Sequence, residues 1–119
     1  MSTIAHLING EYVNDNGRTA SVYNPSTGQV VNQVALASRA TVQQAIAVAQ
    51  AAYPAWRNTP PAKRAQIMYR FKQLLEANKD RIVALISLEH GKTLEDAGGE
   101  LQRGIENIEY ACSAPEILK

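Results

Sequence analysis

The stretch EHGKTLEDAGGELQRGIENIEY, residues 89–110, contains the end of one helix and most of an amphipathic second one. Gly91 is expected to end the first helix, because glycine readily adopts the left-handed conformation that follows a helix. Thr93, with Asp96 three positions later, is typical of a helix N-terminus. Apolar residues then recur at helical spacing and predict one buried face, made of Leu101, Ile105, Ile108 and Cys112.

The same helix carries two adjacent glycines and a single arginine among acidic residues. Glycine inside a helix costs about 1 kcal/mol relative to alanine, so Gly98 and Gly99 predict the close approach of another backbone or of a ligand. Arg103 stands two positions from Leu101 and Ile105, and we expect it towards the flank of the apolar face. A guanidinium fixed on a helix is suited to binding a carboxylate or phosphate through two hydrogen bonds. The alternative is an ordinary surface charge.

Helices are expected throughout residues 41–114. Thr41 and Gln44 match the capping-box pattern, which predicts a helix start at Thr41. Pro54 and Trp56 are expected to close this first helix. The residues that follow should link it to the next helix.

Two more helix starts are expected between this helix and Gly91. Thr59 is the predicted cap of the second helix, with Pro60 at its first position, where the missing N–H costs nothing. Asn78 is expected to begin the third. At the other end of the chain, Pro115 should bound the last helix, and residues 116–119 resemble the start of a strand.

Residues 4–37 are expected to form strands and turns. Asn9-Gly10 between short apolar runs predicts a tight hairpin with positive φ. The segment NPSTG, residues 24–28, is rich in turn-forming residues. A phosphate-binding loop is the alternative for this segment, but its glycine content is too low, so we predict a plain turn.

The bulk composition is that of one globular, soluble domain, with 119 residues, 45% of them hydrophobic. A formal net charge of +1 gives no long-range attraction to nucleic acid or to an anionic membrane, so neither is expected as a partner. We find no apolar run long enough to span a bilayer and no secretory signal. The single cysteine, Cys112, fits a reducing compartment, and we expect a cytoplasmic protein.

The residues by themselves do not describe a catalytic centre. His6 and His90 are the only histidines, and with one cysteine they cannot form a plausible four-ligand metal site. Cys112 lies on the apolar face late in a helix, which predicts a buried structural cysteine and not a nucleophile. Gly98-Gly99 is not a nucleotide-binding loop, because it lies inside a helix and is followed by a glutamate.

Three blocks, INGEYV, YNPSTGQVVNQVALAS and AAYPAWRNTPPAKRAQIMYRFKQLLEANKDRIVALISLEHGKTLEDAGGEL, resemble the amino-terminal part of the aldehyde dehydrogenase superfamily. The last block, GELQRGIENIEYACSAPEILK, is most similar to the methylmalonate-semialdehyde dehydrogenases. The resemblance implies an α/β fold class: for residues 1–119, an N-terminal β-hairpin and strands (about 4–37) followed by four α-helices (about 41–114). It also implies that the NAD-binding core and the catalytic domain lie outside this chain.

The activity implied by the resemblance is NAD-dependent, coenzyme A-acylating oxidation of methylmalonate or malonate semialdehyde to propionyl-CoA or acetyl-CoA, as in valine catabolism. Arginines are thought to hold the substrate carboxylate in that sub-family, and the matching block places this role on Arg103. No catalytic, cofactor-binding or metal-binding residue is carried over to this chain, and Cys112 does not match the family nucleophile. The expected partners are a small aldehyde and other subunits of a homo-oligomer.

Alternatives remain at this stage. One is another branch of the superfamily, such as a succinate-semialdehyde or betaine-aldehyde dehydrogenase; another is a non-enzymatic helical interaction module. We expect the chain to be an inactive fragment that binds no NAD by itself. Its apolar faces should stay uncovered and promote self-association, with Ile82, Leu85 and Ile86 or Leu101, Ile105 and Ile108 as the expected faces.

Overall fold

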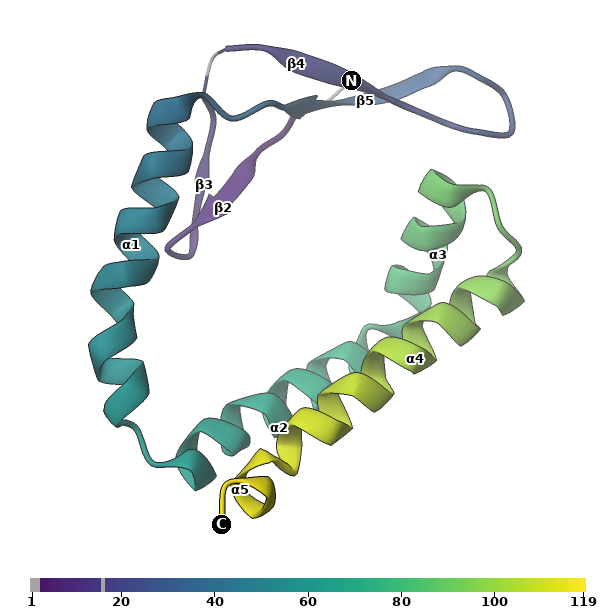
Figure 1. Ribbon diagram of the computed structural model, residues 1–119. Helices are drawn as coiled ribbons and strands as arrows, with labels where there is room; N and C mark the ends of the chain where they lie inside the picture. Colours follow the sequence, from purple (N-terminus) through teal and green to yellow (C-terminus); the bar gives the residue numbers. More distant parts are fainter. Residues whose placement is uncertain (1–2, 16) are drawn as a thin grey trace. The chain divides into compact units, whose positions relative to one another are not determined.

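The computed structural model describes residues 3–15 and 17–119. The chain divides into two compact units, which join in sequence between Trp56 and Arg57. Strands come first and helices follow, with four long helices and one short one (Figure 1). The predicted α/β fold class, in this order of elements, is therefore confirmed.

The first unit contains a three-stranded sheet with the strand order β1–β5–β4. Strand β1 (Thr3–Ile4) runs parallel to β5 (Val30–Ala35), with Ile4 opposite Val34. Strand β4 (Thr19–Tyr23) runs antiparallel to β5 on its other side. The valine-rich β5 is thus the central strand, as expected for β-branched residues in the middle of a sheet.

A separate hairpin joins β2 (His6–Ile8) to β3 (Glu11–Val13). The two residues between them, Asn9 and Gly10, have φ values of 54° and 80°. Positive φ at both central residues matches the right-handed twist of the flanking strands. The predicted Asn-Gly hairpin is confirmed.

Residues 24–28 form the predicted turn. The backbone N–H of Gly28 donates to the carbonyl of Asn24 at 2.8 Å, and the Asn24 side chain accepts from the N–H of Ser26 at 2.9 Å. Gly28 has a φ of 70°. The segment is held by these local hydrogen bonds, which an asparagine at the start of a turn commonly makes.

Helix α1 (Arg39–Asn58) begins earlier than predicted. Ser38 is the capping residue, because its Oγ accepts from the backbone N–H of Thr41 at 3.2 Å. Thr41, the predicted cap, is instead inside the first turn and buried. The carboxylate of Asp15 accepts from both the N–H and the hydroxyl of Ser38, so a tertiary contact selects the helix start.

The end of α1 also differs from the prediction. Pro54 lies inside the helix, which continues to Asn58. A proline removes one backbone hydrogen bond, but its fixed φ is compatible with a helix. The helix therefore includes both residues expected to close it and continues two residues beyond Trp56.

Helix α2 (Pro61–Ala77) begins two residues after the predicted cap, Thr59. Pro60 precedes its first residue, and the proline at the start of the helix is Pro61. Helix α3 (Lys79–His90) follows Asn78, as predicted. The side-chain amide of Asn78 donates backward to the carbonyl of Leu74 at 2.8 Å, so this residue also closes α2.

The second unit is organised around α4 (Leu94–Cys112), which packs against both α2 and α3. Gly91 ends α3 with a φ of 82°, and its N–H donates to the carbonyl of Ser87. Thr93 caps α4 by accepting from the N–H of Asp96 at 3.1 Å. Both predicted helix boundaries are confirmed. The buried residues of α4 are Ala97, Leu101, Ile105 and Cys112.

The final residues form a short helix, α5 (Ala114–Ile117), and not the predicted strand. Its backbone bonds are local, since Glu116 donates to the carbonyl of Ser113 and Leu118 donates to that of Ala114. Pro115 lies in the first turn of α5, where its missing N–H is not needed. Helix α5 packs against α2.

The exposed apolar surface is only partly the one predicted. Leu101 and Ile105 are buried under the other helices, so this face is not left uncovered. Leu85 of α3 is 49% exposed, whereas Ile82 and Ile86 are half-buried. A further exposed apolar face lies on α2, formed by Ile67, Phe71 and Leu74.

Candidate functional site

Helix α4 fixes the position of Arg103. Its buried face, which includes Leu101 and Ile105, packs on the neighbouring helices, and Arg103 itself is exposed. The expectation that Arg103 lies towards the flank of the apolar face is wrong. Each helical residue turns the chain by about 100°, so a residue two positions away lies about 200° around the axis, on the opposite side. Arg103 therefore belongs to the outward face of α4.

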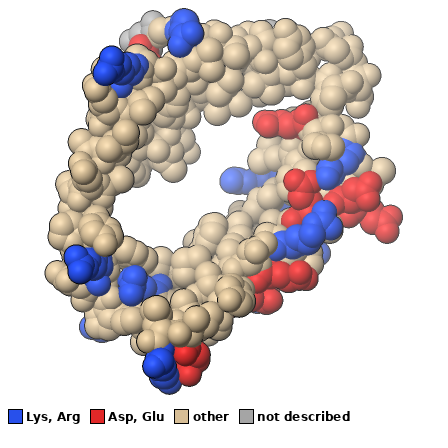
Figure 2. All heavy atoms as spheres, in the orientation of Figure 1, with Lys and Arg blue, Asp and Glu red and all other residues tan. Residues whose placement is uncertain are grey.

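Arg103 is the one basic residue of α4, which also carries Glu95, Asp96, Glu100, Glu106 and Glu109. Within residues 3–15 and 17–119, its guanidinium makes no ion pair. Figure 2 shows basic and acidic side chains interspersed over the second unit. A cation among many carboxylates would ordinarily be paired with one of them, so its unpaired state calls for an explanation.

The adjacent glycines do not receive another backbone. A Cβ built on Gly98 would have no neighbour within 4 Å, and one built on Gly99 would lie 4.0 Å from Nη1 of Arg103. The predicted close approach of a second backbone is therefore absent from the described part of the chain. Instead, the glycines leave open space on the helix, and the Arg103 guanidinium borders part of it.

Lys92, which lies just before α4, forms an ion pair with Glu100, three positions before Arg103 in α4. The carbonyl of Lys92 accepts from the hydroxyl of Ser87 at 2.7 Å, and the Lys92 side chain is only 20% exposed. Hydrogen bonding from Lys92 is the main cause that lowers the pKa of Glu100, and the charges of Lys92, His90 and Arg103 lower it further. Glu100 is therefore held as a carboxylate by the cations near it.

This arrangement is chemically suited to binding a small anion. A guanidinium presents two parallel N–H donors that match the two oxygens of a carboxylate. Arg103 is exposed and unpaired within the part of the chain described here. Within α4, Arg103 is the only cation, so it would make the attractive contact of this helix with an anion.

Cys112 is buried at the end of α4, as predicted for a structural cysteine. Among residues 3–15 and 17–119, no three His, Cys, Asp or Glu side chains are grouped so that they could hold a metal ion. In the same ranges, no helix has both the length and the hydropathy needed to cross a bilayer. Among the described residues, Arg103 is the candidate binding group predicted from the sequence.

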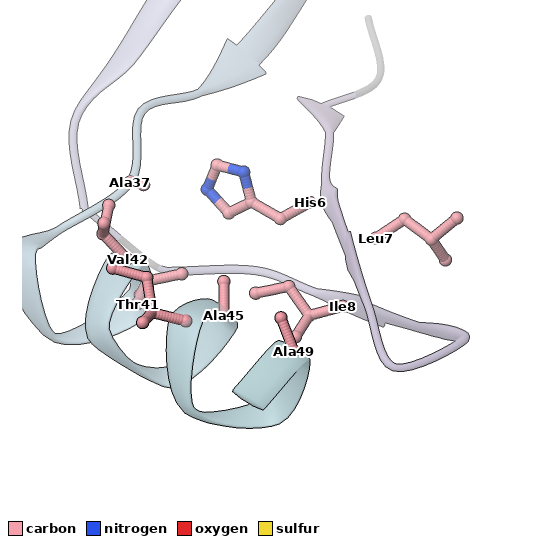
Figure 3. A pocket seen from close by; sticks show the side chains of 9 residues that line it. His6, Leu7, Ile8, Ala37, Thr41, Val42, Ala45 and Ala49 are labelled. Atoms are coloured by element: carbon pink, nitrogen blue, oxygen red, sulfur yellow. The ribbon is translucent and has the colours of Figure 1, made fainter. Parts of the chain in front are cut away.

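A groove of about 480 Å³, which was not predicted from the sequence, lies in the first unit between β2 and the first half of α1 (Figure 3). The imidazole of His6 points towards α1, whereas Leu7 points away. Nε2 of His6 is buried and has no hydrogen-bond partner among the described residues. The alanines of α1 at Ala45 and Ala49 were the available signal, because small residues at helical spacing let a neighbouring element approach.

A family model described as "Aldehyde dehydrogenase family" matches residues 12–119. The chain is 71% identical, over all 119 residues, to a malonate-semialdehyde dehydrogenase of Pseudomonas aeruginosa, of which it covers 24%. It is 44% identical over 116 residues to the malonate-semialdehyde dehydrogenase of Bacillus cytotoxicus. That match covers 97% of this chain and 24% of the relative. The chain thus spans about a quarter of the length of these relatives.

Solved structures agree with these sequence matches. The crystal structure of a methylmalonate-semialdehyde dehydrogenase from Oceanimonas doudoroffii superposes with a TM-score of 0.98 and 61% identity, over 100% of this chain and 24% of that one. The structure of a protein from Sinorhizobium meliloti, described as a methylmalonate-semialdehyde dehydrogenase complexed with NAD, superposes with a TM-score of 0.95 and 40% identity. That match covers 98% of this chain and 24% of that one.

Proposed function

The chain belongs to the aldehyde dehydrogenase family, and on that premise we propose that it is the amino-terminal segment of a malonate- or methylmalonate-semialdehyde dehydrogenase. Support comes from the names of the relatives, which match over nearly the whole chain at 71% and 44% identity. Support also comes from the two solved structures with TM-scores of 0.98 and 0.95. The other branches weighed from the sequence, the succinate-semialdehyde and betaine-aldehyde dehydrogenases, are the alternative candidates.

The substrate assignment depends on one observation: the Arg103 side chain is exposed and forms no ion pair in the described residues. Malonate and methylmalonate semialdehyde differ from simple aldehydes by a carboxylate close to the reacting carbonyl. Arg103 is exposed, is the only cation of α4, and is unpaired in the described residues. In the proposed function, it binds that carboxylate and so orients the aldehyde carbon towards the reacting groups.

The rest of the chemistry belongs to residues beyond this chain. In the proposed enzyme, NAD would accept hydride from the substrate and coenzyme A would take up the acyl group. Gly98 and Gly99 lie inside α4 and do not present a row of free N–H groups, so we do not expect these glycines to bind a cofactor phosphate. We therefore assign this chain to substrate orientation and to packing.

The same proposal includes a cytoplasmic, homo-oligomeric enzyme. A reducing compartment suits the unpaired, buried Cys112. The exposed apolar residues of α2 and α3 provide surface that association could bury. Sedimentation of the complete protein would measure the number of subunits directly.

The substrate assignment is tested in the complete protein that carries this chain, with the substitutions Arg103→Ala and Arg103→Lys. The readout is the ratio of kcat/KM for malonate semialdehyde to kcat/KM for propanal, which has no carboxylate. A hydrogen-bonded charged contact contributes about 1.5–3 kcal/mol, so Arg103→Ala should lower this ratio by roughly ten- to a hundredfold. Arg103→Lys should keep part of the preference, because it keeps the charge but loses the two-point geometry. An unchanged ratio in Arg103→Ala would remove Arg103 from carboxylate recognition.

A further inference from the structure

Glu100 lies three positions from Arg103 on α4, as Glu106 does, and the charge of Arg103 contributes to the lowered pKa of Glu100. Residues three apart on a helix are surface neighbours, and opposite charges at that spacing attract each other. A guanidinium that is paired with a protein carboxylate must break that pair before it can bind a ligand. An Arg103–Glu100 pair would therefore compete with any anionic substrate for the same donors.

The structure shows Glu100 paired with Lys92 instead. Lys92 follows Gly91, whose φ of 82° turns the chain between α3 and α4. Its carbonyl is held by the hydroxyl of Ser87 at 2.7 Å. With 20% of its side chain exposed, against 45% for Glu100, Lys92 is the more enclosed member of the pair. The lysine therefore belongs to the α3–α4 connection and is not a freely moving surface side chain.

Two further observations place Arg103 next to this pair. The charge of Arg103 contributes to the lowered pKa of Glu100, after the contributions of Lys92 and His90. The space over Gly99, where an added Cβ would lie 4.0 Å from Nη1, is left to the guanidinium. Glu100 thus has three basic neighbours, Lys92, His90 and Arg103, and the ion pair forms with Lys92.

We propose that Lys92 is a positioning residue for substrate binding: by pairing with Glu100, it keeps the Arg103 guanidinium available for the carboxylate of an acidic semialdehyde. This inference rests on the proposed function, in which Arg103 binds that carboxylate. Lys92 does not touch the substrate. Its removal should weaken substrate binding without changing the chemical step, since the reacting groups lie elsewhere in the enzyme.

The test uses Lys92→Met in the complete protein. With Lys92 removed, Glu100 is free to pair with Arg103. Exposed ion pairs of this kind shift equilibria modestly, so KM for malonate semialdehyde should rise about two- to fivefold. KM for propanal and kcat for both aldehydes should keep their values. Lys92→Arg should behave as the unchanged protein, because it retains the pairing charge.

The decisive variant is the double substitution Lys92→Met/Glu100→Gln. Because it removes the competing carboxylate as well, it should return KM for malonate semialdehyde to its original value. A lysine that served only the stability of the fold would not be rescued in this way. Lys72→Met is the matched control: it breaks the 3.3 Å ion pair with Glu109 between α2 and α4 and should leave the preference between the two aldehydes unchanged.

Three outcomes would overturn the inference: an unchanged KM in Lys92→Met, an equal rise for propanal, or a double variant that is not rescued. If Lys92→Met does not fold, Glu100→Gln alone decides, because removing the competitor should leave KM for malonate semialdehyde equal or lower. A raised KM in Glu100→Gln would contradict the inference. Failure of the proposed function is recognised separately, by an Arg103→Ala variant that keeps the preference for the carboxylated aldehyde.

Discussion

The carboxylate of Asp15 binds the first turn of α1 through Ser38, accepting from its backbone N–H and, at 3.2 Å, from its hydroxyl. Ser38 in turn accepts from the N–H of Thr41 and lies 3.1 Å from the Thr41 hydroxyl. The connection after hairpin β2–β3 is thus joined to the helix N-terminus. Negative charge is favourable at this end of a helix, where backbone N–H groups are left unpaired.

Asp15→Asn should lower the thermal midpoint of the chain, and the loss should depend on pH. Hydrogen bonds from the Ser38 backbone and then from Thr41 hold the pKa of Asp15 below its ordinary value. For a lowered pKa, the stabilisation is present above the ordinary aspartate pKa of about 3.9. It is lost as the pH falls from there through the folded-state pKa.

The thermal midpoints of Asp15→Asn and of the unchanged chain should therefore converge in strong acid and separate above about pH 4. Thermal unfolding of both proteins between pH 2 and pH 7, followed by circular dichroism, measures the difference. A gap between them that stays constant over this range would show that the Asp15 charge does not stabilise α1.

Replacing Gly10 should reveal the cost of a side chain at positive φ. Gly10 has a φ of 80°, and an added Cβ would meet no atom within 4 Å. Gly10→Ala should therefore destabilise the hairpin through the backbone alone, by roughly 1–2 kcal/mol. Gly10→Asn is the matched control, because asparagine tolerates this conformation better, and it should cost less. Urea unfolding gives both values; equal losses would point to a cause other than φ.

Removing the cap of α4 should destabilise the second unit. The Thr93 hydroxyl accepts from the N–H of Asp96 at 3.1 Å, and loss of such a cap typically costs about 1 kcal/mol. Thr93→Ala should show this loss in urea unfolding, whereas Thr93→Ser retains the accepting oxygen and should lose little. If serine and alanine lower the unfolding free energy equally, the capping bond is not what stabilises this end of α4.

Self-association of the chain remains a prediction, now assigned to a specific surface. Ile67, Phe71 and Leu74 are 42%, 45% and 62% exposed, and their spacing places them together on one side of α2. Phe71→Asp should lower the sedimentation coefficient at high protein concentration, because it places a charge within this apolar face. Lys63→Asp, an exposed polar position of the same helix, controls for the added charge. A compact monomer for the unchanged chain would refute the prediction.

Local patterns in the sequence were sufficient where the hydrogen-bond partners are a few residues apart. Asn9-Gly10 formed the predicted hairpin, Gly91 and Thr93 separated α3 from α4, and Leu101 and Ile105 became buried. Each of these features depends on backbone conformation or on helical spacing. Neighbouring residues determine both, so no knowledge of distant segments was needed.

The candidate site was predicted only in part. The sequence indicated Arg103 as an anion-binding residue, and that role remains a proposal. Its position on the outward face follows from helical geometry and was misjudged. The pairing of Glu100 with Lys92 was not anticipated, because the two residues are eight positions apart and Lys92 lies before the helix that carries Glu100.

The sequence by itself determined the family, the order of strands and helices, and the buried face of α4. Only the tertiary structure decided where α1 begins, which acidic residue forms an ion pair with Lys92, and whether Arg103 forms an ion pair. Ser38 and Thr41 are both good caps by residue type, and the choice between them is made by Asp15, 23 positions earlier. When several local partners are nearly equal in free energy, a contact from a distant segment selects one of them, and residue spacing does not encode that contact.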